Sequence, residues 1–100
     1  MSTLHLLSHS PFGDNRLDSC LRLIAAGDGL LLSGDAVYAL QAGTAPRAAV
    51  ERLPEAVSVF ALEEDLTARG LEGLPERLES IAYARFVELC CLYERTNAWL

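Results

Sequence analysis

Short apolar runs separated by longer, helix-like segments set the pattern of the chain. Three runs, at Thr3–Ser8, Leu30–Ser33 and Val57–Leu62, are rich in apolar residues and bounded by polar or turn residues. Such short bounded runs predict buried β-strands. A weaker fourth strand is predicted at Glu79–Ala82.

Between these runs, apolar residues recur at helical spacing. Leu17, Leu21 and Ile24 predict a helix that begins after the N-cap residues Asp14 and Asn15. Gly27-Asp28-Gly29 is expected to end this helix, and Asn97–Leu100 reads as a tail. Further helices are predicted at Ala36–Leu40, Ala45–Leu53, Glu64–Arg69 and Tyr83–Arg95.

Strand–helix alternation at this spacing is typical of βαβ units, which build a parallel sheet. We therefore predict one small α/β domain over residues 1–100, with a parallel four- to five-stranded sheet and helices on both faces. Ligands and reactive groups in such folds gather at the carboxyl ends of the strands. The segments expected there are Ser8–Gly13, Ser33–Asp35, Leu62–Glu64 and Ala82–Tyr83.

Composition and charge narrow the class of protein. Hydrophobic residues make up 51% of the chain, which indicates a dense core and favours a buried sheet, a face covered by a partner, or both. The net charge is −6, and all eight basic residues are arginines that stand singly. Nucleic-acid binding needs clustered positive charge, so direct binding of nucleic acid is not expected.

The sequence also lacks the usual patterns of membrane spans, signal peptides, metal sites and phosphate-binding loops. No apolar run approaches the about 20 residues of a membrane span, and the start lacks the features of a signal peptide, so we expect a cytoplasmic protein. Three cysteines and two histidines, without zinc-site spacing, predict neither a disulfide framework nor a metal site. No Gly-rich phosphate loop is present, so no cofactor is expected.

Three stretches of the chain resemble the TusB/DsrH family in the right order. They are LHLLSHSPF at Leu4–Phe12, LLLSGDAVYAL at Leu30–Leu40 and VFALEEDLTARGL at Val59–Leu71. Tyr83, Phe86-Val87 and Ala98-Trp99 extend the likeness toward the end of the chain. One departure is Ala36, where family members often carry Gly after the Asp of the second stretch.

The resemblance implies a small parallel-sheet α/β domain inside a heterohexamer. Its partners would be TusC/DsrF-like and TusD/DsrE-like subunits, and the complex would pass persulfide sulfur to an acceptor of the TusE/DsrC type. In the Tus branch the sulfur is used for 2-thiolation of the tRNA wobble uridine, and in the Dsr branch it serves sulfur oxidation. The resemblance leaves open whether this chain is itself catalytic. A stand-alone small α/β enzyme or ligand-binding module is the alternative of another class.

Cys20 is the candidate persulfide carrier, because sulfur transfer needs a thiolate that attacks a persulfide. It lies in the first predicted helix, where the family resemblance also allows a cysteine. The alternative is a small apolar residue that packs on the helix face. Core packing is the favoured role of Cys90 and Cys91, at least one of which must point inward.

Other residues have a structural and a functional interpretation. A histidine near a strand end could move protons. The structural alternative for His5 is a buried, hydrogen-bonded residue, and the structural alternative for His9 is a solvated loop residue. Asp35 is expected to cap the helix at Ala36. Trp99 is expected to fold back onto its own domain or to enter a neighbouring subunit.

The acidic turn Glu63-Glu64-Asp65 is a further candidate. Its carboxylates suit the N-terminus of the helix that follows, and they could also hold a cation or a partner's arginine. Arg69 is expected to pair with Asp65 across one helical turn, because residues four apart are neighbours on a helix.

Overall fold

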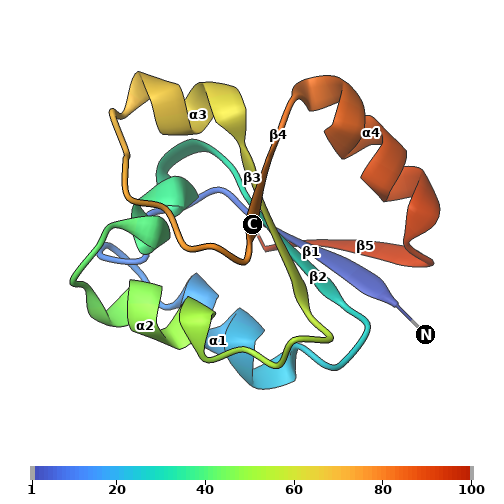
Figure 1. The fold of residues 1–100 in the computed structure, drawn as a ribbon. Coiled ribbons are helices and arrows are strands. Elements are labelled where there is room, and N and C mark those ends of the chain that lie inside the picture. The colour runs from blue at the N-terminus through green and yellow to red at the C-terminus, as the bar shows by residue number, and fades with distance from the viewer. Residues whose placement is uncertain (1, 100) are drawn as a thin grey trace.

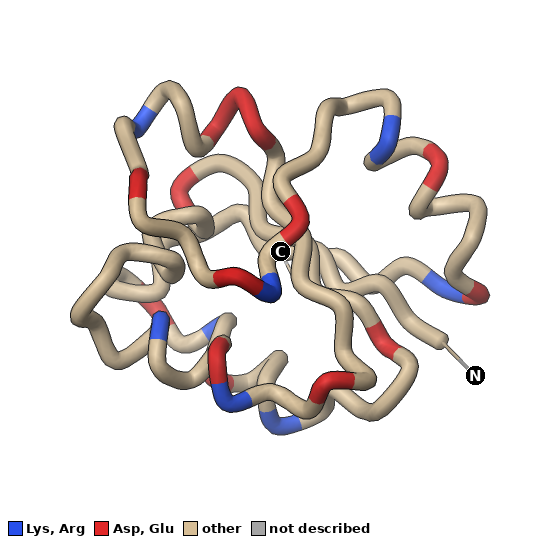
Figure 2. The backbone as a smooth tube through the Cα atoms, viewed as in Figure 1, with Lys and Arg blue, Asp and Glu red and all other residues tan. Residues whose placement is uncertain are grey.

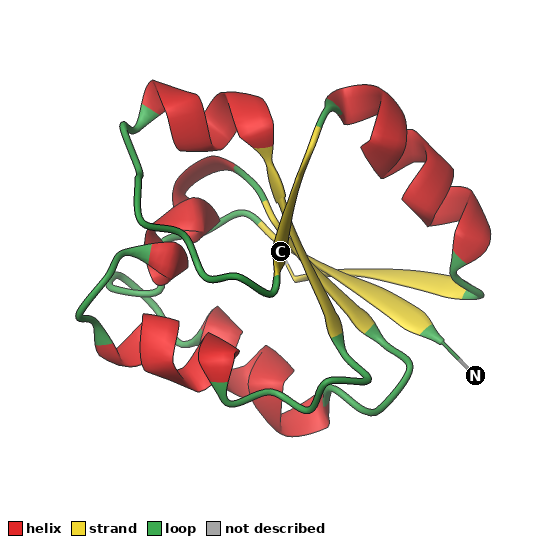
Figure 3. Cartoon of the chain, in the orientation of Figure 1, coloured by secondary structure: helices red, strands yellow, loops and turns green. Residues whose placement is uncertain are grey.

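The computed structural model describes residues 2–99, which form an all-parallel five-stranded sheet with the strand order β4-β3-β2-β1-β5 (Figure 3). The strands are β1 (Thr3–Leu7), β2 (Gly29–Leu32), β3 (Ser58–Leu62), β4 (Leu78–Ile81) and β5 (Arg95–Trp99). The helices are α1 (Arg16–Leu23), the 3-10 helix η1 (Gly34–Leu40), α2 (Ala45–Glu51), α3 (Glu63–Ala68) and α4 (Tyr83–Leu92). This architecture confirms the predicted parallel α/β sheet.

The central strand β2 explains why the apolar runs become strands rather than helices. All four of its residues are buried, because both faces of a parallel sheet are covered by helices. Successive side chains point to opposite faces, so Leu30 and Leu32 join the core on one side while Leu31 joins the core on the other. A continuous run of leucines therefore supplies two separate cores.

The two faces of the sheet are covered unequally (Figure 1). α1, η1, α2 and α3 contribute to the larger core on one face. On the other face, Leu89 of α4 packs on the smaller core formed by β1, β2, β3 and β4. Since β4 and β5 are the opposite edges of the sheet, the connection through α4 crosses this whole face. Tyr83, Val87 and Leu92 of α4 remain exposed.

The end of α4 meets the start of β2 at a glycine. A Cβ atom at Gly29 would lie 2.5 Å from the Tyr93 hydroxyl oxygen and 3.0 Å from a methyl carbon of Leu4. Real Cβ atoms do not approach other atoms so closely. Glycine at position 29 therefore leaves room for the Tyr93 ring, and a larger residue there would force that side chain to move.

The C-terminal tail and the ends of two helices differ from the sequence predictions. Residues 95–99 are not a tail, because β5 pairs in parallel with β1 along its whole length. α4 accordingly ends at Leu92 and not at Arg95. Leu100, the last residue of the predicted tail, lies outside the described residues.

The first helix also ends early, because α1 stops at Leu23 and the next residue is already extended. Gly27 and its neighbours form the turn into β2, where the Gly27 N–H donates to the Ala56 carbonyl. The predicted role of these glycines as the end of the helix was therefore wrong.

Charged residues are distributed without a basic stripe in the view of Figure 2, where arginine segments alternate with acidic ones. Within residues 2–99, no helix combines the length and the apolar character needed to cross a membrane.

Candidate functional site

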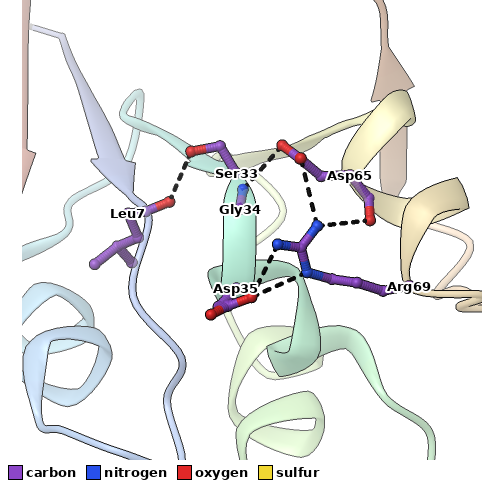
Figure 4. Close-up of polar contacts among 6 residues, drawn as sticks. All are labelled: Leu7, Ser33, Gly34, Asp35, Asp65 and Arg69. Carbon is purple, nitrogen blue, oxygen red and sulfur yellow. Dashed lines mark hydrogen bonds and ion pairs between the residues drawn. The ribbon is translucent and has the colours of Figure 1, made fainter.

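The carboxyl ends of β1, β2 and β3 meet at one edge of the sheet, because the strands run in parallel. Ser33, just after β2, is tied to the end of β1. Its backbone N–H donates to the Leu7 carbonyl oxygen at 2.9 Å. Its side-chain hydroxyl donates to the same oxygen at 3.3 Å (Figure 4). The predicted strand-end segment at Ser33–Asp35 is therefore a turn that is hydrogen-bonded to the end of β1.

Gly34 continues this turn in a conformation that favours glycine. Its φ is +52°, a value that side chains with a Cβ rarely adopt. A Cβ atom at Gly34 would also lie 3.3 Å from the Ser8 carbonyl oxygen. The Gly34 N–H donates to the Asp65 carboxylate at 2.9 Å, which joins the β2 turn to the first turn of α3.

Arg69 completes the cluster by connecting two carboxylates (Figure 4). Its guanidinium donates to Asp35 Oδ1 at 2.9 and 3.1 Å and to Asp65 Oδ1 at 3.4 Å. It also lies over the Tyr38 ring, 5.8 Å from the centroid. The hydrogen bond with Asp35 and the two negative charges outweigh desolvation and raise the pKa of Arg69, so the cluster favours the charged guanidinium.

The cluster confirms one sequence prediction and corrects another. Asp65 and Arg69 pair across one helical turn, as predicted. Asp35 does not cap the short helix: it lies inside η1, and its side chain pairs with Arg69, the residue that follows α3. The capping interpretation failed because it considered only neighbours in sequence. The cluster holds the turn after β2 against α3. The Asp35 side chain at the rim of the cluster remains 60% exposed.

Cys20 lies at a distance from this cluster, inside the larger core. The residue is fully buried, in the second turn of α1. Burial, reinforced by the negative charge of Asp28, raises the pKa of the Cys20 thiol to about 12. A persulfide carrier needs an accessible thiolate. These features favour the packing interpretation, and the carrier role of Cys20 stays a prediction.

The two cysteines of α4 are more accessible. Cys90 is half-buried against the smaller core and Cys91 is exposed, so one thiol points inward as predicted. The thiols of residues 2–99 thus form a graded series from the core to the surface.

His5 is a buried, hydrogen-bonded residue. Its Nε2 lies 3.3 Å from Asp28 Oδ2, and its Nδ1 lies 3.2 Å from the indole nitrogen of Trp99. Trp99 therefore folds back onto its own domain, the first of the two predicted placements. His9 is exposed in the loop after β1.

Asp28 is a functional-site candidate that the sequence interpretation missed. Burial disfavours its charge, but the N–H groups of Ala25 and Thr3 and the ring of His5 outweigh this effect and lower the pKa of Asp28. The residue stands between two glycines, a pattern that indicates only a turn. Nothing local in the sequence reveals that the carboxylate faces His5.

Arg77 is a second residue that the sequence interpretation missed, and it lies just before the edge strand β4. Its guanidinium donates to the carbonyls of Leu53, Pro54 and Val57 at 2.5 to 2.8 Å. It thereby fixes the connection between α2 and β3. An isolated arginine in a loop gives no sequence signal for such a role.

Among the described residues, no group of three or more His, Cys, Asp or Glu side chains is placed to hold a metal ion. A surface groove of about 710 Å³ lies between the start of α1 and α2. Phe12, which is 58% exposed, lines it together with Leu17 and Pro46.

Comparison with known sequences gives a family match over most of the chain. The family described as DsrH like protein matches residues 9–96. The protein named Protein TusB from Erwinia tasmaniensis is 39% identical over 97 residues, which cover 96% of this chain and 99% of that protein. Proteins of the same name from Serratia proteamaculans and Escherichia coli O81 are 41% and 38% identical over the same coverage.

Solved structures show the same fold at lower sequence identity. The crystal structure of the ychN protein from E. coli has a TM-score of 0.81 at 21% identity, covering 98% of this chain and 99% of that chain. Protein MTH1491 from Methanobacterium thermoautotrophicum has a TM-score of 0.67 at 18% identity, covering 94% of this chain and 95% of that chain. At these identities the likeness extends to the fold alone.

Proposed function

The chain belongs to the DsrH-like family, which includes the TusB proteins, and from this premise we propose that it is a subunit of a sulfur-relay complex. The complex would pass persulfide sulfur toward 2-thiolation of the tRNA wobble uridine. The observation that carries the proposal is the match to proteins named TusB at 34 to 41% identity over nearly the whole of both chains. Such coverage leaves no large segment of either protein unmatched.

The proposed assembly is a heterohexamer with TusC/DsrF-like and TusD/DsrE-like subunits. Exposed apolar side chains support an assembly, because a free domain of this size gains nothing from leaving them in water. Tyr83, Val87 and Leu92 on α4 are 61%, 49% and 67% exposed. Phe12 adds a further large apolar side chain at the groove beside α1.

Within the complex, the chain acts mainly as a scaffold with an auxiliary thiol. Its Cys20 is fully buried, and its raised pKa leaves the thiol protonated at neutral pH. A packed thiol of this kind is a poor nucleophile. The principal sulfur carrier would then be a cysteine of a partner subunit, with Cys20 as the remaining candidate carrier in this chain if the core opens.

The proposed role places the chain in the cytoplasm and does not include direct contact with tRNA. The chain has a net charge of −6, and its arginines are paired or dispersed, so it offers no cluster of positive charge for phosphates. Sulfur would instead leave the complex on an acceptor protein of the TusE/DsrC type.

Co-expression with the two related subunits tests the assembly. Size-exclusion chromatography followed by native mass spectrometry is expected to show one complex that contains all three chains in equal numbers. Co-expression of this chain with either partner alone separates pairwise contacts from the complete assembly. A chain that elutes as a stable monomer in the presence of both relatives would contradict the proposal and favour a stand-alone module.

The Dsr branch is the alternative pathway, because the matching family carries the DsrH description. Removal of this chain from its host distinguishes the two. In the Tus branch, mass spectrometry of digested tRNA would show loss of the 2-thiouridine derivative. In the Dsr branch, tRNA thiolation would be unchanged and oxidation of stored sulfur would stop.

A further inference from the structure

A buried histidine connects the C-terminal strand to the body of the domain. His5 is 5% exposed in the middle of β1. Its ring lies between the Asp28 carboxylate, in the turn before β2, and the Trp99 indole, at the end of β5. The three side chains come from segments that are far apart in sequence, so the network joins three parts of the fold.

The donors and acceptors around the ring define its tautomer. An indole N–H can only donate, so His5 Nδ1 must accept the hydrogen bond from Trp99 and carries no proton. The proton of the neutral ring is then on Nε2, which donates to Asp28 Oδ2. These donors and acceptors fit the Nε2–H tautomer of the imidazole ring.

We propose that His5 is a pH-sensitive latch that holds the end of β5 while it is neutral and releases it when it is protonated. Protonation adds a hydrogen to Nδ1, where it meets the Trp99 N–H donor head-on. At the same time the hydrogen bond to Asp28 becomes a charge-assisted ion pair. The protonated ring thus stays with Asp28 and loses Trp99.

β5 is the element that such a change would move. It is an edge strand, paired with β1 on one side, and its residues 95–98 are exposed. Trp99 is its one described residue that packs against the larger core. Loss of the bond to His5 removes the hydrogen bond that holds the Trp99 side chain at the end of this strand, while the backbone pairing with β1 remains.

The charged and titratable groups around His5 determine the direction of the response. The turn before β2 contributes Asp28, whose lowered pKa keeps it negative through the neutral range. Cys20 of α1 interacts with Asp28, and its raised pKa keeps the thiol uncharged in the neutral range. The register partners of His5 on β2 and β5 are Leu30 and Asn97, which do not titrate. Among residues 2–99, Asp28 is the charged partner of His5, and its contact is compatible with both states of the ring.

Fluorescence of the single tryptophan tests the latch directly, because Trp99 is the only Trp of the chain. As the pH is lowered far enough to protonate His5, the emission of the intact protein is expected to shift to longer wavelength in one transition. Far-UV circular dichroism measured alongside is expected to stay constant, which separates release of Trp99 from unfolding. His5→Gln is expected to abolish the transition.

His9→Gln is the matched control, because His9 is the other histidine and lies exposed in a loop. It is expected to keep the full transition. A transition that persists in His5→Gln, or its absence from the unmodified chain, would overturn the proposal. Should His5→Gln fail to fold, ¹⁵N NMR of the histidine rings in the unmodified chain decides the matter. The Nε2–H tautomer is required at pH 8, and the Nδ1–H tautomer would refute the latch. The inference does not depend on the proposed sulfur relay.

Discussion

Replacement of Arg77 by alanine offers a quantitative test of how the edge of the sheet is held together. The Arg77 guanidinium donates to the carbonyls of Leu53 at 2.5 Å, Val57 at 2.7 Å and Pro54 at 2.8 Å. These carbonyls belong to the connection between α2 and β3, whereas Arg77 itself precedes β4. Its removal should therefore loosen the connection and the edge strand together.

The magnitude follows from the burial of these bonds. A hydrogen bond to a charged group contributes ~1.5–3 kcal/mol. The bonds to Leu53 and Val57 are partly buried, while water can replace the exposed bond to Pro54. The expected loss in the free energy of unfolding is about 2–4 kcal/mol. For a domain of this size each kcal/mol corresponds to ~4–8 °C, so Tm should fall by roughly 8–32 °C.

Two control variants make this prediction specific. Arg77→Lys keeps the charge but lacks the planar fork, so it should lose most of the same stability. Arg52→Ala removes an exposed arginine at the end of α2 and should cost less than about 1 kcal/mol. Urea unfolding followed by circular dichroism measures all three variants. If Arg77→Ala were no less stable than Arg52→Ala, the reasoning from the carbonyl contacts would be refuted.

Three further predictions follow from the buried and clustered polar groups. Because the folded-state pKa of Cys20 is about 12 against an ordinary 9.0, the fold should lose stability as pH rises from 9.0 toward 12; Cys20→Ala should weaken this alkaline loss in thermal melts. Asp28 has a lowered pKa, so its contribution is present above pH 3.8 and lost as pH falls below it; Asp28→Asn should flatten that part of an acid titration. Asp65→Asn, which weakens the bond to the Gly34 N–H, should lower stability more than Asp35→Asn, whose exposed pair contributes under about 1 kcal/mol; equal urea midpoints for the two variants would contradict the geometry.

The first three strands could be predicted from the sequence because their burial is local and continuous. Leu30, Leu31 and Leu32 are apolar whichever face they meet, so the run signals a central strand by itself. β5 could not be predicted in this way. Its residues are mostly exposed and polar, and it is a strand because its backbone pairs with β1 from the other end of the chain. Such pairing leaves no pattern within the strand.

In the candidate site, too, the contacts between neighbours in sequence could be predicted and the contacts between distant segments could not. The Asp65–Arg69 pair follows from helical spacing, and the acidic first turn of α3 follows from its position after a strand. The contact between Asp35 and Arg69 depends on how η1 and α3 pack, which the sequence does not specify. The same holds for Asp28 beside His5, because these residues meet only when β1 and β2 pair.

Sulfur transfer through the reconstituted complex tests the central claim most directly. The TusD/DsrE-like subunit is first loaded with persulfide sulfur, and intact-mass spectrometry then follows the arrival of one sulfur atom on the acceptor protein. The proposed role predicts transfer when this chain and both relatives are present, and little transfer when this chain is left out. The Cys20→Ser form should support transfer if the chain is a scaffold. Equal transfer with and without this chain would contradict its role as a subunit of the relay.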